Sequence, residues 1–86
     1  MKVYFHRNFN KSYKKCSVKI KDQFKKRLKI FLADPNNVIL ENHPLRGKWQ
    51  KFRSINITGD YRAIYIYLSE QEVEFFTIGT HSYLYD

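Results

Sequence analysis

Three segments rich in β-branched and aromatic residues follow one another in the second half of the chain, and only short turns separate them. The segments are residues 50–57, 61–68 and 73–78, and residues 58–60 and 69–71 between them have a turn-forming composition. Strands joined by connections this short pair antiparallel. The pattern therefore predicts a three-stranded meander whose middle strand, nearly continuous in apolar residues, is buried.

The first half of the chain passes from one short β-forming segment, residues 2–5, to helical periodicity. Residues 8–16 can form a short helix, and Ser17 is a suitable N-cap for a longer helix that ends near Ala33. The apolar residues of the longer helix recur at helical spacing and are expected on one face: Ile20, Phe24, Leu28, Phe31 and Leu32. The order β-α-α-β-β-β, with both helices packed on an antiparallel sheet, predicts one α+β domain over residues 1–86.

The charge of the chain restricts its partners. Lys and Arg number 16 against 8 Asp and Glu, which gives a formal net charge of +8 and a pI near 9.7. Such a basic domain favours a polyanionic partner. Charge alone does not decide whether this partner is RNA, DNA, a membrane surface or an acidic protein. The alternative is that the charge only keeps the protein in solution. No apolar run approaches the ~20 residues of a membrane span, and the charged N-terminus does not resemble a secretory signal. We therefore expect a cytoplasmic protein that does not bind a membrane.

The cysteine and histidine content argues against a metal site or a disulfide. Cys16 is the single cysteine, so no internal disulfide can form, and a lone thiol suits a reducing compartment. The three histidines lack the close spacing of metal ligands, and no glycine-rich phosphate loop is present. We therefore expect neither a metal nor a small-molecule cofactor.

Side chains able to cleave RNA without a metal gather in the second half of the chain. They are two histidines, an aspartate, an arginine and a tyrosine: His43, His81, Asp60, Arg62 and Tyr85. Such cleavage needs one group to deprotonate the 2′-hydroxyl, another to protonate the leaving 5′-oxygen, and a cation to stabilise the phosphorane. Histidine suits both proton transfers, because its unperturbed pKa is about 6.5. The residue types therefore indicate a candidate ribonuclease.

Three motifs in this half resemble the RelE/ParE superfamily of bacterial toxins. They are His-Pro-Leu-Arg-Gly-Lys-Trp at residues 43–49, Asp-Tyr-Arg-Ala-Ile-Tyr at 60–65, and Ile-Gly-Thr-His with a tyrosine four residues later at 78–85. The first and third are closest to the YafQ branch. The resemblance implies a toxin of a type II toxin–antitoxin system that cleaves messenger RNA on the ribosome. It also implies an antitoxin partner, in which an acidic segment is expected on charge grounds.

The resemblance carries over residue by residue. His81 matches the principal catalytic histidine of YafQ, His43 the histidine of its His-Pro-Leu segment, and Asp60 an aspartate before the central strand. Arg62 matches a catalytic arginine of RelE, where YafQ has an aliphatic residue. Tyr85 matches a RelE tyrosine, where YafQ has a phenylalanine.

These matches give a hypothesis for the reaction. His81 is the general acid and Asp60 or His43 the general base, although the sequence leaves open which group is acid and which is base. Arg62 stabilises the transition-state phosphate, and Tyr85 stacks on or positions a base. Further substrate contacts are expected from residues near the start of the meander: Arg46, Lys48, Lys51, Arg53 and Asn56.

Structural roles stay open for the same residues. Asp60 follows Gly59 and is a common turn residue. Arg62 on a central strand could belong to an ion pair, Tyr85 could cover the sheet edge, and His43 could only shape its loop. Trp49 is expected in the core or at its rim rather than as a platform for a base.

Two departures from the YafQ pattern keep rival functions open. Asn56 stands where YafQ has a histidine and cannot exchange a proton near pH 7, and Thr77 stands where YafQ has an arginine. One rival is a non-enzymatic inhibitor of DNA gyrase of the ParE type, against which the two histidines, His43 and His81, argue. The other is a catalytically weakened RelE-fold binding protein.

Overall fold

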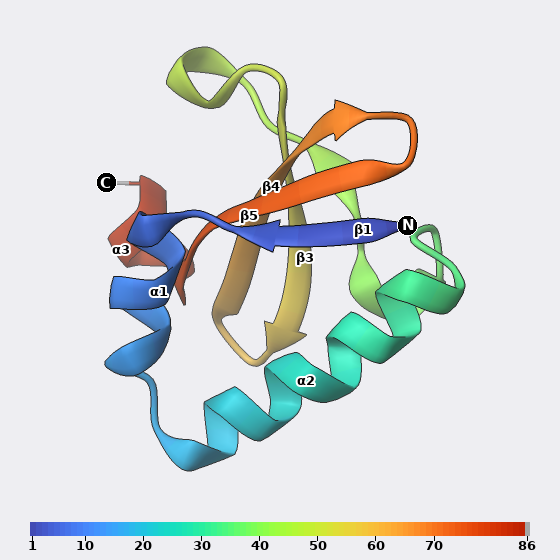
Figure 1. Ribbon diagram of the computed structural model, residues 1–86. Coiled ribbons are helices and arrows are strands. Elements are labelled where there is room, and N and C mark those ends of the chain that lie inside the picture. Colours follow the sequence, from blue (N-terminus) through green and yellow to red (C-terminus); the bar gives the residue numbers. More distant parts are fainter. Residues whose placement is uncertain (86) are drawn as a thin grey trace.

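The computed structural model describes residues 1–85 and confirms the predicted order of elements (Figure 1). The sequence pattern does not predict β2 or α3, because elements this short carry no periodicity. The helices, 3₁₀ helices (η) and strands are β1 (Lys2–Phe5), α1 (Arg7–Lys14), α2 (Val18–Ala33), η1 (Val38–Leu40), β2 (His43–Pro44), η2 (Gly47–Trp49), β3 (Phe52–Thr58), β4 (Tyr61–Ser69), β5 (Glu72–Thr80) and α3 (His81–Tyr85).

The strands form one five-stranded sheet in the order β1-β5-β4-β3-β2. The predicted meander is confirmed, since β3, β4 and β5 pair antiparallel, and β2 adds to it in the same sense. At the other edge β1 pairs parallel with β5, from Lys2 opposite Glu72 to Phe5 opposite Phe75. This parallel pair requires a long connection between its strands, which the two helices and the meander supply.

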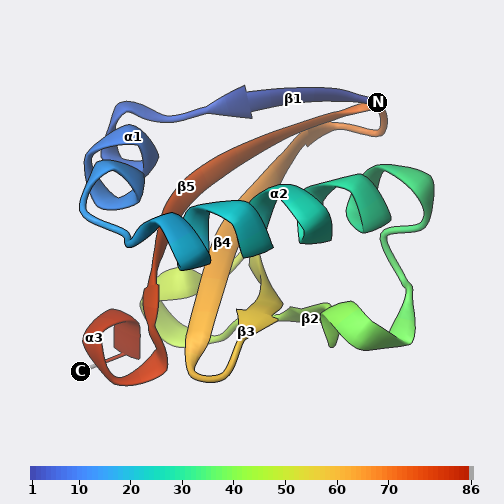
Figure 2. The same ribbon diagram turned by 90° about the horizontal axis from the view of Figure 1, so that it is seen from below.

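Helix α2 lies across one face of the sheet, as Figure 2 shows, and the main core fills the space between them. The predicted apolar positions Ile20, Phe24 and Phe31 are buried there. Leu32 was expected on the same face, but it is 45% exposed. The reason is helical geometry: Leu32 directly follows Phe31 and is therefore turned about 100° away from the buried stripe.

Side-chain caps determine where both long helices begin. Ser17 is the predicted N-cap of α2, and its hydroxyl accepts a hydrogen bond from the backbone N–H of Ile20 at 3.3 Å. His6 caps α1, because its Nδ1 accepts from the N–H of Asn8 at 2.9 Å. Within residues 1–85, no helix combines the length and apolar character needed to cross a bilayer.

The sheet has a second face, which points away from α2, and this second face carries residues of the predicted site. Cross-strand partners share a face, so Asn56, Arg62 and Gly79 form one row on β3, β4 and β5. Rings of Trp49, Phe52 and Phe76 pack together at the other end of this face, with centroids 5.5–5.9 Å apart. Trp49 is half-buried, which confirms the predicted place at the rim of a core.

Candidate functional site

Arg62 is anchored at the end of the sheet where β3 turns into β4. Its Nη1 donates to the side-chain oxygen of Asn56 at 2.6 Å, and to the carbonyl oxygens of Gly59 and Tyr61 at 3.0 and 3.1 Å. A guanidinium has five N–H donors. All the bonds that Arg62 makes within residues 1–85 use Nη1, so the Nε and Nη2 groups remain available to an anion.

Asn56 links Arg62 to a carboxylate. Its side-chain nitrogen donates to Glu41 Oε2 at 3.3 Å while its side-chain oxygen holds Arg62. Arg27 of α2 also donates to the backbone oxygens of Asn56 and Ile39, which ties the loop before β2 to the sheet. Sequence patterns do not point to Glu41, because only the folded loop, with Glu41 at φ 47°, brings it beside Asn56.

His43 lies on β2, next to the same loop. Its Nδ1 is 2.8 Å from the backbone oxygen of Glu41. A carbonyl oxygen can only accept, so this bond places the proton of a neutral imidazole on Nδ1 and leaves a lone pair on Nε2. The ring is exposed, and this tautomer is the one that a general base needs.

His81 and Asp60 are neighbours on the other side of Arg62. The backbone N–H of His81, at the start of α3, donates to the carbonyl oxygen of Asp60 at 2.8 Å. The ring of Tyr85 meets the His81 ring edge to face, with centroids 4.6 Å apart. The Tyr85 hydroxyl is buried, and no partner for it exists among the described residues. This packing orients His81.

The two histidines are therefore separated by the width of the sheet. In the register His43 is level with Thr77 of β5, and His81 comes four residues after Thr77. Their backbones are therefore about 14 Å apart across three strand spacings and about a further 13 Å apart along the strands. Arg62 occupies β4 between them. The fold thus places an exposed imidazole on each side of one fixed guanidinium.

Comparison with known proteins identifies the family. The model of the bacterial toxin of type II toxin–antitoxin systems named YafQ matches residues 1–86. The chain belongs to the YafQ toxin family. No functionally curated protein matches it at a significant level.

Solved structures of related toxins share the fold of this YafQ-family chain. The YafQ crystal structure from E. coli strain BL21(DE3) superposes with a TM-score of 0.82 at 20% identity, over 98% of this chain and 97% of that one. A YoeB/ParE toxin from Agrobacterium tumefaciens gives 0.77 at 19%, over 94% and 99%. The E. coli DinJ–YafQ toxin–antitoxin complex gives 0.76 at 22%, over 98% and 96%. The predicted RelE-like fold is therefore confirmed.

The predicted phosphate contacts of this YafQ-family chain divide into two groups. Arg46, Lys48 and Lys51 are exposed in the loop between β2 and β3, which Trp49 anchors on the second face. Arg53 is opposite Tyr65 in the register and so lies on the α2 side of the sheet. The structure thus sets Arg53 apart from Arg62, because neighbouring residues of a strand point to opposite faces.

Arg53 instead belongs to a polar clamp behind the site. Asn42 accepts from Arg53 Nε at 2.9 Å, and its side-chain nitrogen donates to the Tyr65 hydroxyl at 2.7 Å and the Pro35 oxygen at 2.9 Å. Burial raises the pKa of Tyr65 to about 12, so the phenol stays neutral near pH 7. Asn42 lies between Glu41 and His43, so the clamp fixes the segment that carries both.

Thr77, the second departure from the YafQ pattern, is buried between β5 and α1. Its side chain is 4% exposed, and its hydroxyl is 3.1 Å from that of Ser12 on α1. This contact helps to hold α1 against β5. Position 77 therefore offers no cation to a substrate in this chain.

Proposed function

We propose that this YafQ-family toxin is an endoribonuclease that cleaves messenger RNA on the ribosome by metal-free acid–base catalysis. The observation that carries the proposal is the position of Arg62, held by Asn56 with free N–H groups between His43 and His81. A fixed cation between two groups that can transfer protons suits phosphodiester cleavage.

The reaction begins at the 2′-hydroxyl of the nucleotide bound at Arg62. His43 takes this proton on Nε2, and the 2′-oxygen forms a bond to phosphorus. The guanidinium of Arg62 stabilises the phosphorane, whose charge exceeds that of the substrate. His81 donates a proton to the 5′-oxygen as the bond from phosphorus to this oxygen breaks. The products are a 2′,3′-cyclic phosphate and a 5′-hydroxyl end.

Asp60 is the alternative general base. Its carbonyl oxygen holds the start of α3, and its carboxylate belongs to the exposed turn between β3 and β4. Asp60→Asn and His43→Gln separate the two assignments, because only replacement of the base lowers the rate at saturating substrate by the 10²–10⁴-fold of a lost proton transfer.

The partners follow from charge and from the family. E. coli YafQ has been solved in complex with DinJ, and we propose an antitoxin with an acidic segment for this chain of net charge +8. The same charge suits ribosomal RNA and messenger RNA.

The test is primer-extension mapping of messenger RNA in a purified translation system. The parent protein is expected to cut at defined codon positions, and His81→Ala is expected to remove the cuts. Ser82→Ala is the matched control, because Ser82 is the next residue of α3 and is also exposed. Cuts that persist in His81→Ala would contradict the mechanism. Growth arrest without any cuts would point to gyrase, which a supercoiling assay measures, or to a non-catalytic translation block.

A further inference from the structure

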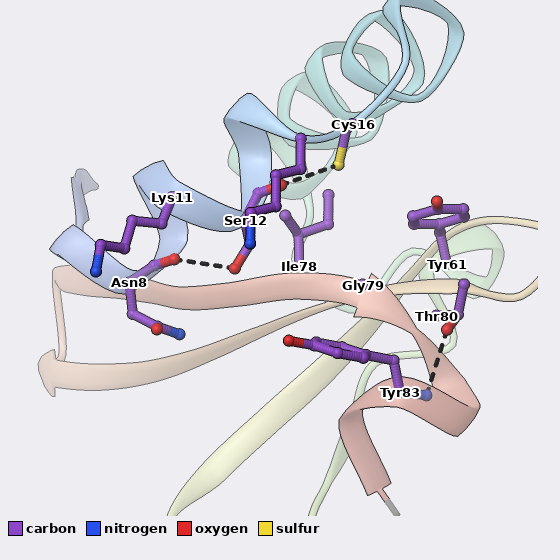
Figure 3. Close-up of a pocket in the computed structure, with 10 residues that line it drawn as sticks. Asn8, Lys11, Ser12, Cys16, Tyr61, Ile78, Gly79, Thr80 and Tyr83 are labelled. Atoms are coloured by element: carbon purple, nitrogen blue, oxygen red, sulfur yellow. Dashed lines mark hydrogen bonds between the residues drawn. The ribbon is translucent and has the colours of Figure 1, made fainter.

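A cavity of about 310 Å³ opens at the edge of the sheet, outside the residues placed in the reaction. It lies along β5 beyond Phe75, where the pairing with β1 ends, and between α1 and α3 (Figure 3). Its size is at the lower end of the ~300–1,000 Å³ that small-molecule sites occupy. A single nucleotide unit, rather than a longer segment, suits this volume.

The α1 wall of the cavity is cationic and polar. Lys11 and Lys15 are four residues apart, so they lie on the same side of this segment. Asn8 and Ser12 face β5, as Figure 3 shows for Ser12, and both are bonded there: the Asn8 side-chain nitrogen donates to the Phe76 oxygen at 3.2 Å, and the Ser12 hydroxyl is 3.1 Å from that of Thr77. Among the described residues that line the cavity, none is acidic. The wall therefore attracts an anion through its two lysines.

The opposite wall holds an exposed aromatic ring. Tyr83 of α3 is 75% exposed, the largest exposure of any phenylalanine, tyrosine or tryptophan among the described residues. Its ring lies against the backbone of Gly79, where an added Cβ would be 3.3 Å from the Tyr83 ring carbon Cδ2. The N–H of Tyr83 also donates to the Thr80 hydroxyl, which fixes the first turn of α3. An aromatic ring that packs on the backbone through one face and exposes the other is a surface on which an unpaired base can stack.

We propose that this cavity binds one nucleotide of single-stranded RNA next to the nucleotide that is cleaved. Tyr83 stacks on its base, and Lys11 and Lys15 contact its phosphate. The inference rests on the proposed function, because it extends the RNA path from Arg62 to the neighbouring cavity. Gly79 pairs with Arg62 in the register, and Thr80 precedes His81, so cavity and reaction site are adjacent.

The single thiol of the chain reports on occupancy. Cys16 lines the cavity, its Sγ donates to the Ser12 backbone oxygen at 3.5 Å, and burial raises its pKa. We would measure alkylation of Cys16 by iodoacetamide at pH 8.5, with and without a five-nucleotide RNA that carries 2′-O-methyl groups. This RNA cannot be cleaved, because its 2′-oxygen is blocked.

The expected result is at least a five-fold slower alkylation when the RNA is saturating, and no slowing by inorganic phosphate at the same concentration. Tyr83→Ala is expected to weaken RNA binding about ten-fold, since stacking contributes to binding of each base. Tyr83→Phe keeps the ring and is expected to bind as the parent does. Unchanged alkylation with bound RNA, or equal protection by phosphate, would overturn the proposal.

Salt dependence tests the lysines separately. Lys11→Ala combined with Lys15→Ala is expected to reduce the slope of log affinity against log salt by about 0.7, because both lysines contact one phosphate and each neutralised phosphate of a single strand contributes ~0.7. Lys14→Ala combined with Lys19→Ala removes the same charge outside the cavity lining and is the control. Equal slopes in the two double variants would count against the lysine contacts.

These measurements do not depend on cleavage, so the two proposals can fail separately. If the cavity variants bind RNA like the parent while His81→Ala abolishes cleavage, only the cavity assignment is wrong. If Cys16 is protected as expected while His81→Ala still cleaves, the catalytic assignment is wrong and the RNA site stands.

Discussion

Arg62 donates to the side-chain oxygen of Asn56 at 2.6 Å across neighbouring strands, and this is the shortest hydrogen bond of the candidate site. Asn56 replaces a histidine of the YafQ pattern, so it contributes no proton transfer. In the structure its side-chain oxygen holds the Arg62 guanidinium. Under the proposed function Asn56 is therefore a positioning residue, which the next variant tests.

Removal of this bond should reduce activity more than stability. Asn56→Ala leaves the Arg62 guanidinium without its side-chain acceptor, and we expect cleavage to fall by about 10–100-fold, which corresponds to the ~1.5–3 kcal/mol of a hydrogen bond to a charged group. Asn10→Ala on the exposed side of α1 is the control. Single-turnover cleavage rates check this prediction, and an Asn56→Ala rate equal to that of the parent would contradict it.

Loss of the polar clamp should act on both stability and activity. Asn42→Ala leaves the Arg53 Nε donor and the Tyr65 hydroxyl without their partner, so we expect destabilisation by about 1–3 kcal/mol. The segment that carries His43 also loses its anchor, which should lower the cleavage rate. Chemical denaturation measures the first effect. Asn36→Ala is the control, since its side chain lies exposed in the same loop; equal stability of both variants would argue against the clamp.

The ring and the hydroxyl of Tyr85 should have separate effects on cleavage and stability. Tyr85→Phe keeps the ring against His81 and removes a buried hydroxyl for which residues 1–85 provide no partner, so we expect unchanged cleavage and stability equal to the parent or up to about 1 kcal/mol higher. Tyr85→Ala removes the ring and should lower cleavage. Thermal unfolding and cleavage rates test both variants. A strong loss of cleavage in Tyr85→Phe would instead assign a role to the hydroxyl.

Alkaline pH should destabilise the fold through Tyr65. The pKa of its phenol is about 12 in the folded state against the usual 10.0 of a tyrosine, so above pH 10 the unfolded chain loses the proton first. The contribution of Tyr65 to the free energy of unfolding is therefore fully present below pH 10. It is lost as pH rises toward 12, by up to about 2.7 kcal/mol for two pKa units. Urea unfolding from pH 9 to 11.5 measures this. Tyr65→Phe should show a smaller decrease, and an identical decrease would refute the assignment.

The N-cap of α2 should affect stability alone. Ser17→Ala removes the acceptor for the Ile20 N–H, at a cost of about 1 kcal/mol. A domain of this size should then melt about 4–8 °C lower. Cleavage below the melting range should equal that of the parent, because α2 lies on the face opposite Arg62. A loss of activity without a change in melting temperature would be inconsistent with this separation.

Local patterns of the sequence predicted the elements well. The spacing of Ile20, Phe24 and Phe31 identifies the buried face of α2, and Ser17 marks its start, because both signals depend on neighbours a few residues away. The turns at 58–60 and 69–71 likewise determine the meander, since short connections leave only antiparallel pairing. Leu32 shows the limit of the pattern, because adjacent helical residues cannot share one narrow stripe.

The sequence by itself thus determined which residue types are present, the family, and the local elements that carry them. Only the tertiary structure decided which side chains meet. Pairing across β3, β4 and β5 brings Asn56 and Gly79 beside Arg62, and strand alternation turns Arg53 to the other face. The loop before β2 adds Glu41, and the end of β5 adds the cavity beside Tyr83. Such contacts join residues that are distant in the chain. They depend on the strand register and on the path of the loops, and no local sequence pattern encodes either of these.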